Sequence, residues 1–255
     1  MNQETKRATA PSMEEVAQAV NRYEQRCGER FAPRAVLFDM DGVLFNSMPN
    51  HATSWVQTAQ TFHLDMTPEE AYMHEGRTGA DTINILMQRR YGRPATEAEI
   101  EQIYAEKCRL FNACPTAGKM EGADMVLARV KAAGRTICVV TGSGQQSLLE
   151  RLQTGYPGYF APERIVSSKD VKQGKPNPEP YLRALEKTGL KPHEAIVVEN
   201  APLGVTAGVA AGILTIAVNT GPLPDSALTD LGADLLFPSM TLLAGGIDAI
   251  LSQGA

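Results

Sequence analysis

The chain contains few of the features that are typical of membrane, secreted or nucleic-acid-binding proteins. No apolar run approaches the ~20 residues needed to span a bilayer, and no apolar signal-peptide segment lies near the first residue. The four cysteines have no CxxC spacing, so we expect reduced, structural thiols and a cytoplasmic location. A net charge of −5 disfavours a broad nucleic-acid-binding surface. These absences predict a globular protein without a membrane or nucleic-acid partner.

The 255 residues, of which 43% are hydrophobic, are enough for a core domain and a smaller second domain. Short β-branched runs alternate with helical patterns, which is typical of a parallel sheet flanked by helices. We therefore predict an α/β fold. Upstream of its first strand, Ser12 and Glu15 form a capping-box pattern that predicts a helix over residues 13–26. This helix is expected to pack on the core, and contact with another chain is the alternative.

The first predicted strand ends in two carboxylates. Asp39 and Asp41 follow the apolar run 35–38, and Gly42 lets the chain turn directly afterwards. Side chains at i and i+2 of an extended segment point the same way, so both carboxylates should project from the carboxyl end of a buried strand. Two ionised carboxylates this close need a cation or a shared proton, and Mg²⁺ prefers oxygen ligands. A nucleophile for phosphoryl transfer is one interpretation, and an acidic turn is the other.

Three later segments favour the catalytic interpretation, because each lies where a strand is predicted to end. Residues 141–143 offer a threonine hydroxyl and backbone N–H groups to phosphoryl oxygens. Lys175 lies in a proline-stiffened loop, where an ammonium can neutralise a transferring phosphoryl group. Glu199 and Asn200 follow another apolar run and carry oxygen atoms that suit a metal ion.

In this order, the four segments resemble the motifs of the haloacid dehalogenase superfamily of Mg²⁺-dependent phosphotransferases. The resemblance covers residues 34–240 and implies a Rossmann-like parallel sheet. The helical pattern between the first two motifs resembles the inserted C1-type cap of the β-phosphoglucomutase-like subfamily, which closes over the site. We expect a core of residues 34–46 and 118–255, a cap of residues 47–117 and an N-terminal helical extension of residues 1–33. Residues 46–50 and 114–118 would form two connecting strands of the hinge.

The resemblance also implies roles for individual residues. Asp39 would attack phosphorus to form an aspartyl phosphate, and Asp41 would be the general acid and base. Mg²⁺ would be held by Asp39, the Asp41 carbonyl and Asn200, while Glu199 would either bind the metal or orient Lys175. The substrate-binding candidates are Glu75, Arg77, Thr141, Gly142, Ser143, Lys175, His51 and Asn46.

Two of these candidates belong to the predicted cap and its hinge. Arg77 lies between Gly76 and Gly79 and is expected to clamp the distal phosphate of the substrate, and a solvated charge at a helix end is the alternative. His51 would communicate with Asp41, or it would be a polar filler of the hinge.

Three residues favour an inorganic pyrophosphatase within this subfamily. Asn200 and Asn46 stand where sugar phosphomutases commonly have Asp, and the lost negative charge favours a more anionic substrate. Glu75 adds a carboxylate from the cap that could hold a metal-bound water or a second cation. The strings FDMDGVLFNSMP, HEGRTGA, GKPNPEPY and ENAPLGV closely resemble those of the subfamily's pyrophosphatases.

We therefore expect Mg²⁺-dependent hydrolysis of pyrophosphate to two phosphates. The first alternative is a β-phosphoglucomutase or a small sugar-phosphate phosphatase, which would share every catalytic group. The second is a weakly active phosphate-binding regulatory protein. The sequence does not give the oligomeric state, for which a monomer is the simpler expectation.

Overall fold

The computed structural model describes residues 6–144 and 148–253, and within them six parallel strands form one sheet. In sheet order β3-β2-β1-β4-β5-β6, β1 lies between β2 and β4, with Phe38 aligned to Val139 and Val198. Strand order reverses beside β1, which is where open α/β sheets bind ligands. The parallel sheet confirms the predicted fold class. The strands are β1 (Ala35–Phe38), β2 (Thr136–Val140), β3 (Ile165–Val166), β4 (Ala195–Glu199), β5 (Leu214–Val218) and β6 (Leu235–Phe237).

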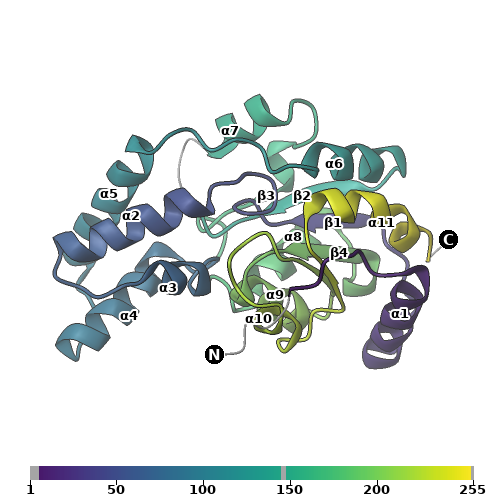
Figure 1. The fold of residues 1–255 in the computed structure, drawn as a ribbon, viewed down its shortest axis with the longest axis horizontal. Helices are drawn as coiled ribbons and strands as arrows, with labels where there is room; N and C mark the ends of the chain where they lie inside the picture. The colour runs from purple at the N-terminus through teal and green to yellow at the C-terminus, as the bar shows by residue number, and fades with distance from the viewer. Residues whose placement is uncertain (1–5, 145–147, 254–255) are drawn as a thin grey trace.

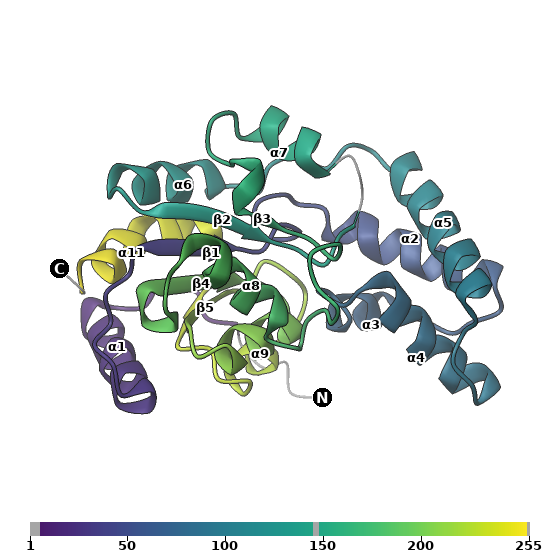
Figure 2. The ribbon, with the colours of Figure 1, turned by 180° about the vertical axis from the view of Figure 1, so that it is seen from behind.

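Helices cover both faces of the sheet (Figures 1 and 2). On one face, α1, α6, α7 and α11 pack with Val36 and Phe38, and on the other α8 and α9 pack with Ala35 and Leu37. Successive side chains of β1 thus enter opposite apolar layers, which explains why the whole strand is apolar. The helices of this part of the chain, with the short helix α10 included, are α1 (Met13–Cys27), α6 (Ala123–Ala132), α7 (Leu148–Gly155), α8 (Glu179–Thr188), α9 (Pro202–Ala210), α10 (Ser226–Thr229) and α11 (Met240–Ser252). Two 3₁₀ turns lie at Pro162–Arg164 and Pro192–Glu194.

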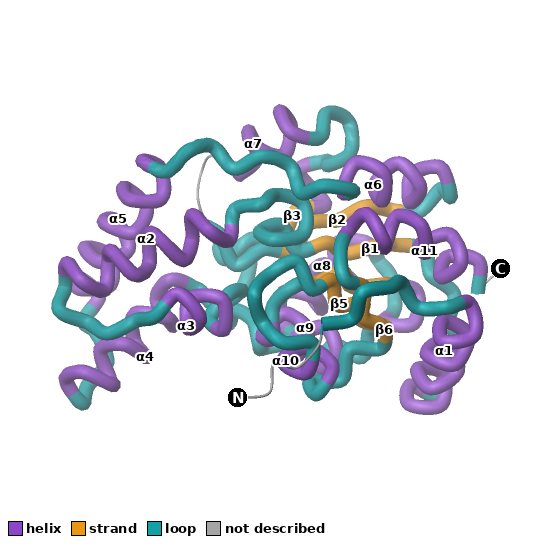
Figure 3. Tube along the Cα trace, in the orientation of Figure 1, coloured by secondary structure: helices purple, strands orange, loops and turns teal. Residues whose placement is uncertain are grey.

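The first four of the five helices between β1 and β2 form the inserted cap at one end of the molecule (Figure 3). They have an apolar core of their own, which includes Trp55, Ile83 and Ile103. Separate cores for the sheet and the insert support our proposed domain boundaries. The cap helices are α2 (Met48–Thr61), α3 (Pro68–Met73), α4 (Gly79–Tyr91) and α5 (Glu97–Ala113).

The prediction of two connecting strands in the hinge is wrong. The two segments that connect the core to the cap pair through one bridge, between Phe45 and Lys119. The Asn46 N–H also donates to the Gly118 carbonyl at 2.9 Å. Helix α2 already begins at Met48, because Pro49 in its first turn favours helix initiation.

The N-terminal extension forms the predicted helix α1. Ser12 and Glu15 make both hydrogen bonds of the capping box, and Gly28 ends the helix with a left-handed φ of 72°. Val16, Ala19, Val20 and Tyr23 are buried in the main core, where α1 contacts α11. The helix therefore packs on the core. Among the described residues, no helix has the length and apolar composition to cross a bilayer.

Candidate active site

Asp39 and Asp41 extend from the central strand and are both 2% exposed. The Asp39 N–H donates to the Val198 carbonyl at 3.0 Å, so β1 stays anchored to β4 up to the first carboxylate. Gly42 then turns the chain with a φ of +88°, and a Cβ at this position would lie 1.9 Å from Nδ2 of Asn200. Glycine is therefore needed here both for the turn and for the close approach of the fourth motif.

Lys175 brings three of the motifs together. Its buried Nζ donates to Oδ1 of Asp39 at 2.6 Å, to Oε1 of Glu199 at 2.5 Å and to the Val140 carbonyl at 2.9 Å. Burial opposes the ammonium, but Asp39 and Glu199 outweigh it and raise the pKa of Lys175. Glu199 also accepts from the Tyr181 hydroxyl at 2.7 Å. Glu199 therefore contacts both Lys175 and Tyr181.

Asp41 faces the cap rather than Lys175. Its Oδ1 accepts from the Ser47 hydroxyl and lies 3.3 Å from Nε2 of His51, without hydrogen-bond alignment. Burial by itself would raise the pKa of Asp41, but His51 and Ser47 outweigh it and hold that pKa below its usual value. His51 therefore lies where it contacts the proposed proton-transfer carboxylate.

Lys107 is a site residue that the sequence interpretation missed. Its Nζ lies 3.1 Å from Nδ1 of His51 and 4.8 Å from the centre of the Phe111 ring. Although it is charged, Lys107 is 3% exposed on the same helical face as Ile103 and Phe111. The sequence did contain a signal for this residue, since Lys107 lies four residues after Ile103 and four before Phe111 on an apolar helical stripe. A lysine at such a position is buried only when it has polar or charged partners.

Two buried oxygen atoms in the site accept no hydrogen bond from any described residue, namely Oδ2 of Asp39 and Oδ1 of Asn200. Buried polar atoms are rarely left without a partner, and both are hard oxygen donors of the kind that Mg²⁺ binds. No group of three His, Cys, Asp or Glu side chains among the described residues would hold a metal by itself. The donor set therefore fits Mg²⁺ only if it includes the Asn200 amide and a backbone carbonyl, as the resemblance implies.

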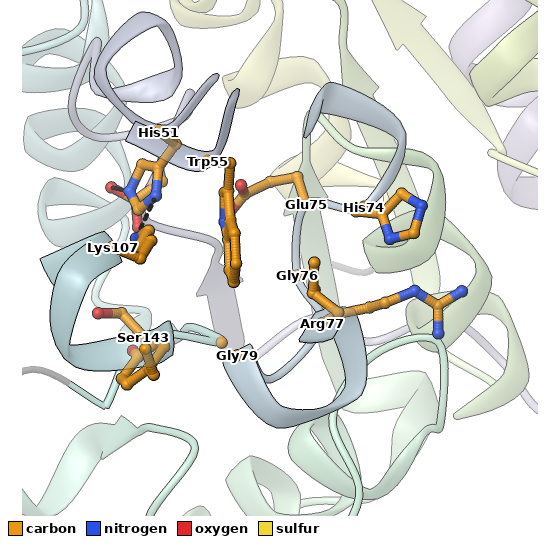
Figure 4. A pocket seen from close by; sticks show the side chains of 13 residues that line it. His51, Trp55, His74, Glu75, Gly76, Arg77, Gly79, Lys107 and Ser143 are labelled. Atoms are coloured by element: carbon orange, nitrogen blue, oxygen red, sulfur yellow. Dashed lines mark hydrogen bonds and ion pairs between the residues drawn. The ribbon is translucent and has the colours of Figure 1, made fainter. Parts of the chain in front are cut away.

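Glu75 reaches the same site from the cap. Burial raises the pKa of its carboxyl group well above the usual value, and the charges of Asp41 and Asp39 raise it further. Glu75 lines a cavity of about 30 Å³, compared with 220 to 400 Å³ for three hollows elsewhere on the described surface. Figure 4 shows Trp55, His51, Lys107 and Glu75 around this cavity. The cavity is thus small, and the carboxyl groups of Asp41 and Glu75 both belong to residues that line it.

The cap closes on the core through glycines. A Cβ on Gly142 would lie 2.8 Å from the Gly76 carbonyl oxygen, and one on Gly174 would lie 2.8 Å from Cγ2 of Thr78. Gly142 and Ser143 line the cavity, and Oγ1 of the 4% exposed Thr141 accepts from the Ser143 N–H at 3.1 Å. The cap loop therefore rests directly on the second and third motifs.

Two predicted site residues are not brought to the carboxylates. Arg77 lines the cavity through part of its length, but Figure 4 shows its guanidinium on the side of His74, away from His51 and Lys107. Asn46 is exposed and lines a separate hollow with Gly221. Both positions follow from how the cap and hinge are oriented, which a linear motif does not specify.

The chain belongs to the haloacid dehalogenase-like hydrolases, because the model of that family matches residues 36–218. A solved structure described as "Putative beta-phosphoglucomutase from Bacteroides vulgatus" is 55% identical, with a TM-score of 0.92 over 95% of this chain and 99% of that one. Hexitol phosphatase A of Escherichia coli is 36% identical over 73% of this chain and 83% of the relative. "Putative pyrophosphatase PpaX" of Clostridium perfringens is 29% identical over 79% of this chain and 91% of the relative.

Proposed function

We propose that this haloacid dehalogenase-like hydrolase is a Mg²⁺-dependent inorganic pyrophosphatase. The observation that carries the proposal is the Glu75 carboxylate, which the cap brings to the small cavity beside Asp41 and Asp39. A neutral sugar ring brings no cation that would favour the ionised form of this carboxyl group. Pyrophosphate with bound cations does, and it also has fewer atoms to fit in a cavity of about 30 Å³.

The proposed residue roles follow from the contacts. Lys175 holds Asp39 at 2.6 Å and would fix the carboxylate for in-line attack on phosphorus. A bond then forms between an Asp39 oxygen and phosphorus, the bridging P–O bond breaks, and Asp41, which must first take up a proton, passes that proton to the departing phosphate. Asp41 next takes a proton from the water that hydrolyses the aspartyl phosphate. Thr141 and the adjoining N–H groups would stabilise the transferring oxygens.

Asp39, the Asp41 carbonyl and Asn200 would hold Mg²⁺, consistent with the two unpartnered oxygens. When bound, the ion supplies charge neutralisation for the carboxylates and for the phosphoryl oxygens. Gly42, one residue after Asp41, leaves room for the Asn200 amide, because a Cβ there would lie 1.9 Å from Nδ2 of Asn200.

The second candidate is hydrolysis or rearrangement of a sugar phosphate. The names of the relatives favour it over pyrophosphate, since they include hexitol, phosphorylated-carbohydrate and 6-phosphogluconate phosphatases as well as the β-phosphoglucomutase-like structure. Every group around Asp39 would serve both reactions. The two candidates therefore differ only in what the cap contributes.

The deciding experiment compares kcat/KM with Mg²⁺ for pyrophosphate, α- and β-glucose 1-phosphate, a hexitol phosphate and an aryl phosphate. We expect pyrophosphate to be preferred by about a hundredfold or more, or ~3 kcal/mol of transition-state binding. A sugar phosphate with the highest kcat/KM would overturn the proposal and establish the second candidate.

The Glu75→Ala variant tests the observation that carries the proposal. We expect it to reduce kcat/KM for pyrophosphate by about a hundredfold and for the aryl phosphate by less than about threefold, because only pyrophosphate needs the cap carboxylate. Glu69→Ala, which removes an exposed carboxylate of α3, is the matched control. Equal losses for both substrates would show that Glu75 is structural.

A further inference from the structure

The segment before α1 is linked by a chain of hydrogen bonds to the turn at Gly42, which follows Asp41. The segment of residues 6–12 starts beside α10 and runs across the core to α1 (Figure 1). Arg7 anchors this segment in two directions. Its side chain donates to Glu15 of α1 at 2.8 Å, and its backbone N–H donates to Oδ2 of Asp225 at 2.5 Å.

Asp225 passes this restraint to the loop of residues 219–225. Its Oδ1 accepts from Nδ2 of Asn219 at 2.6 Å, and the same Nδ2 donates to the Leu223 carbonyl at 2.9 Å. Asn219 is 6% exposed, and its N–H donates to the Phe237 carbonyl at 2.9 Å. Lys6 adds a further bond from its Nζ to the Gly221 carbonyl. The half-buried Asp225 carboxylate is thus the point at which the N-terminal segment and the loop are joined.

The loop in turn contacts both halves of the active site. The Thr220 hydroxyl donates to the Gly42 carbonyl at 2.7 Å, one residue after the proposed proton-transfer carboxylate Asp41. On the cap side, a Cβ on Gly221 would lie 3.4 Å from the Tyr72 ring, which stands three residues before Glu75. A shift of the loop would therefore alter both the turn that positions Asp41 and the surface on which the cap rests.

We propose that Asp225 is a positioning residue for the hydrolytic reaction, because it ties the N-terminal segment to the loop that supports the Gly42 turn and Tyr72. Asp225 and residues 6–34 lie outside residues 36–218, so the family match assigns them no part in the reaction. The inference rests on phosphohydrolase activity and not on which phosphate compound is the substrate. Misplacement of a catalytic group by about 1 Å can cost up to a hundredfold in rate, so a remote support can matter.

The test compares Asp225→Ala with Asp230→Ala, which removes an exposed carboxylate at the end of α10. Both are assayed on whichever phosphate compound the wild-type protein hydrolyses best, so failure of the pyrophosphate proposal does not affect the result. We expect Asp225→Ala to lower kcat by about tenfold or more. Its melting temperature should stay within about 3 °C of wild type, and Asp230→Ala should match wild type throughout. Equal kcat and KM in the two variants would overturn the proposal.

A double-mutant cycle with Thr220→Val separates positioning from a general loss of structure. Thr220→Val removes the hydroxyl that contacts the Gly42 carbonyl and nearly preserves side-chain shape. If Asp225 acts through this loop, the double variant should lose little more kcat than the worse single variant, because both changes interrupt one path. Multiplicative losses would show that the two residues act independently, and would also overturn the proposal.

Discussion

At the scale of single residues, the site is organised by one buried ammonium. Lys175 is 1% exposed and lies between Asp39 and Glu199, with Nζ–O distances of 2.6 and 2.5 Å. A buried charge requires partners of opposite sign, and Lys175 has two such partners in Asp39 and Glu199. A divalent cation held by Asp39, the Asp41 carbonyl and Asn200, as proposed, would add positive charge beside these carboxylates.

The Asp39→Asn variant should have no measurable turnover, because an amide cannot form the acyl phosphate. The protein should still fold, since Lys175 keeps Glu199 as its ionic partner. Phosphate release over several hours gives the activity, and thermal melting gives the folded state. A folded variant with more than about one thousandth of wild-type kcat would rule out covalent catalysis by Asp39, because ordinary single contacts account for smaller losses.

At the scale of elements, α1 is attached to the core through one face. Tyr23 is fully buried, forms an edge contact with Phe31 at a ring separation of 5.8 Å and donates to the Gly212 carbonyl at 2.8 Å. The helix therefore contributes a large apolar surface and satisfies a carbonyl next to β5. Its caps, Ser12 and Gly28, make its boundaries a local property of the sequence.

Tyr23→Ala should destabilise the protein by about 3 kcal/mol or more, because it leaves a cavity in the main core. Tyr23→Phe should cost about 1 kcal/mol, since it removes only the hydrogen bond to Gly212. Asn21→Ala, on the exposed face of the same helix, is the control and should change stability by less than about 0.5 kcal/mol. Urea unfolding followed by circular dichroism measures all three. A small effect of Tyr23→Ala would mean that α1 does not form part of the cooperative core.

At the scale of the whole molecule, the cap lies close against the core. A Cβ on Gly142 would lie 2.8 Å from the Gly76 carbonyl oxygen, and one on Gly174 would lie 2.8 Å from Cγ2 of Thr78, so the cap loop of residues 76–79 rests on both glycines. This approach leaves a cavity of about 30 Å³ beside Asp41 and Glu75. The sole tryptophan of the chain, Trp55, lines the cavity, so its fluorescence can report on ligand binding there.

Gly142→Ala should lower kcat/KM for every substrate by about tenfold or more, because the added methyl group would lie 2.8 Å from the Gly76 carbonyl oxygen when the cap is closed. The clash lies between cap and core and not inside either apolar core, so the melting temperature should change by less than about 3 °C. Gly245→Ala in α11 adds the same group where nothing lies within 4 Å, and it should leave kcat/KM unchanged. Full activity of Gly142→Ala would show that tight closure is not required.

Much of the fold and part of the candidate site could be predicted from local patterns. The strand at residues 35–38, the capping box of α1 and the order of the four motif segments depend on near neighbours in the chain. Because parallel strands bring their carboxyl ends to one edge, these patterns placed Asp39 and Glu199 at the same edge of the sheet, and the family resemblance added contact with Lys175 as one of two possible roles of Glu199. Local patterns did not predict the hinge correctly. Helix α2 begins at Met48 with Pro49 in its first turn, and one bridge stands in place of the two strands that were expected.

The sequence by itself determined the sheet, the helices and the chemistry of the strand ends, because hydrophobic period, caps and carboxylate spacing are encoded over a few residues. Only the tertiary structure decided that Lys107 enters the site, that the Arg77 guanidinium lies beside His74, and that Asn46 lines a different hollow. Those three outcomes depend on how the cap is rotated against the core. That rotation is set by close packing between surfaces whose residues are far apart in the chain, and no local pattern records it.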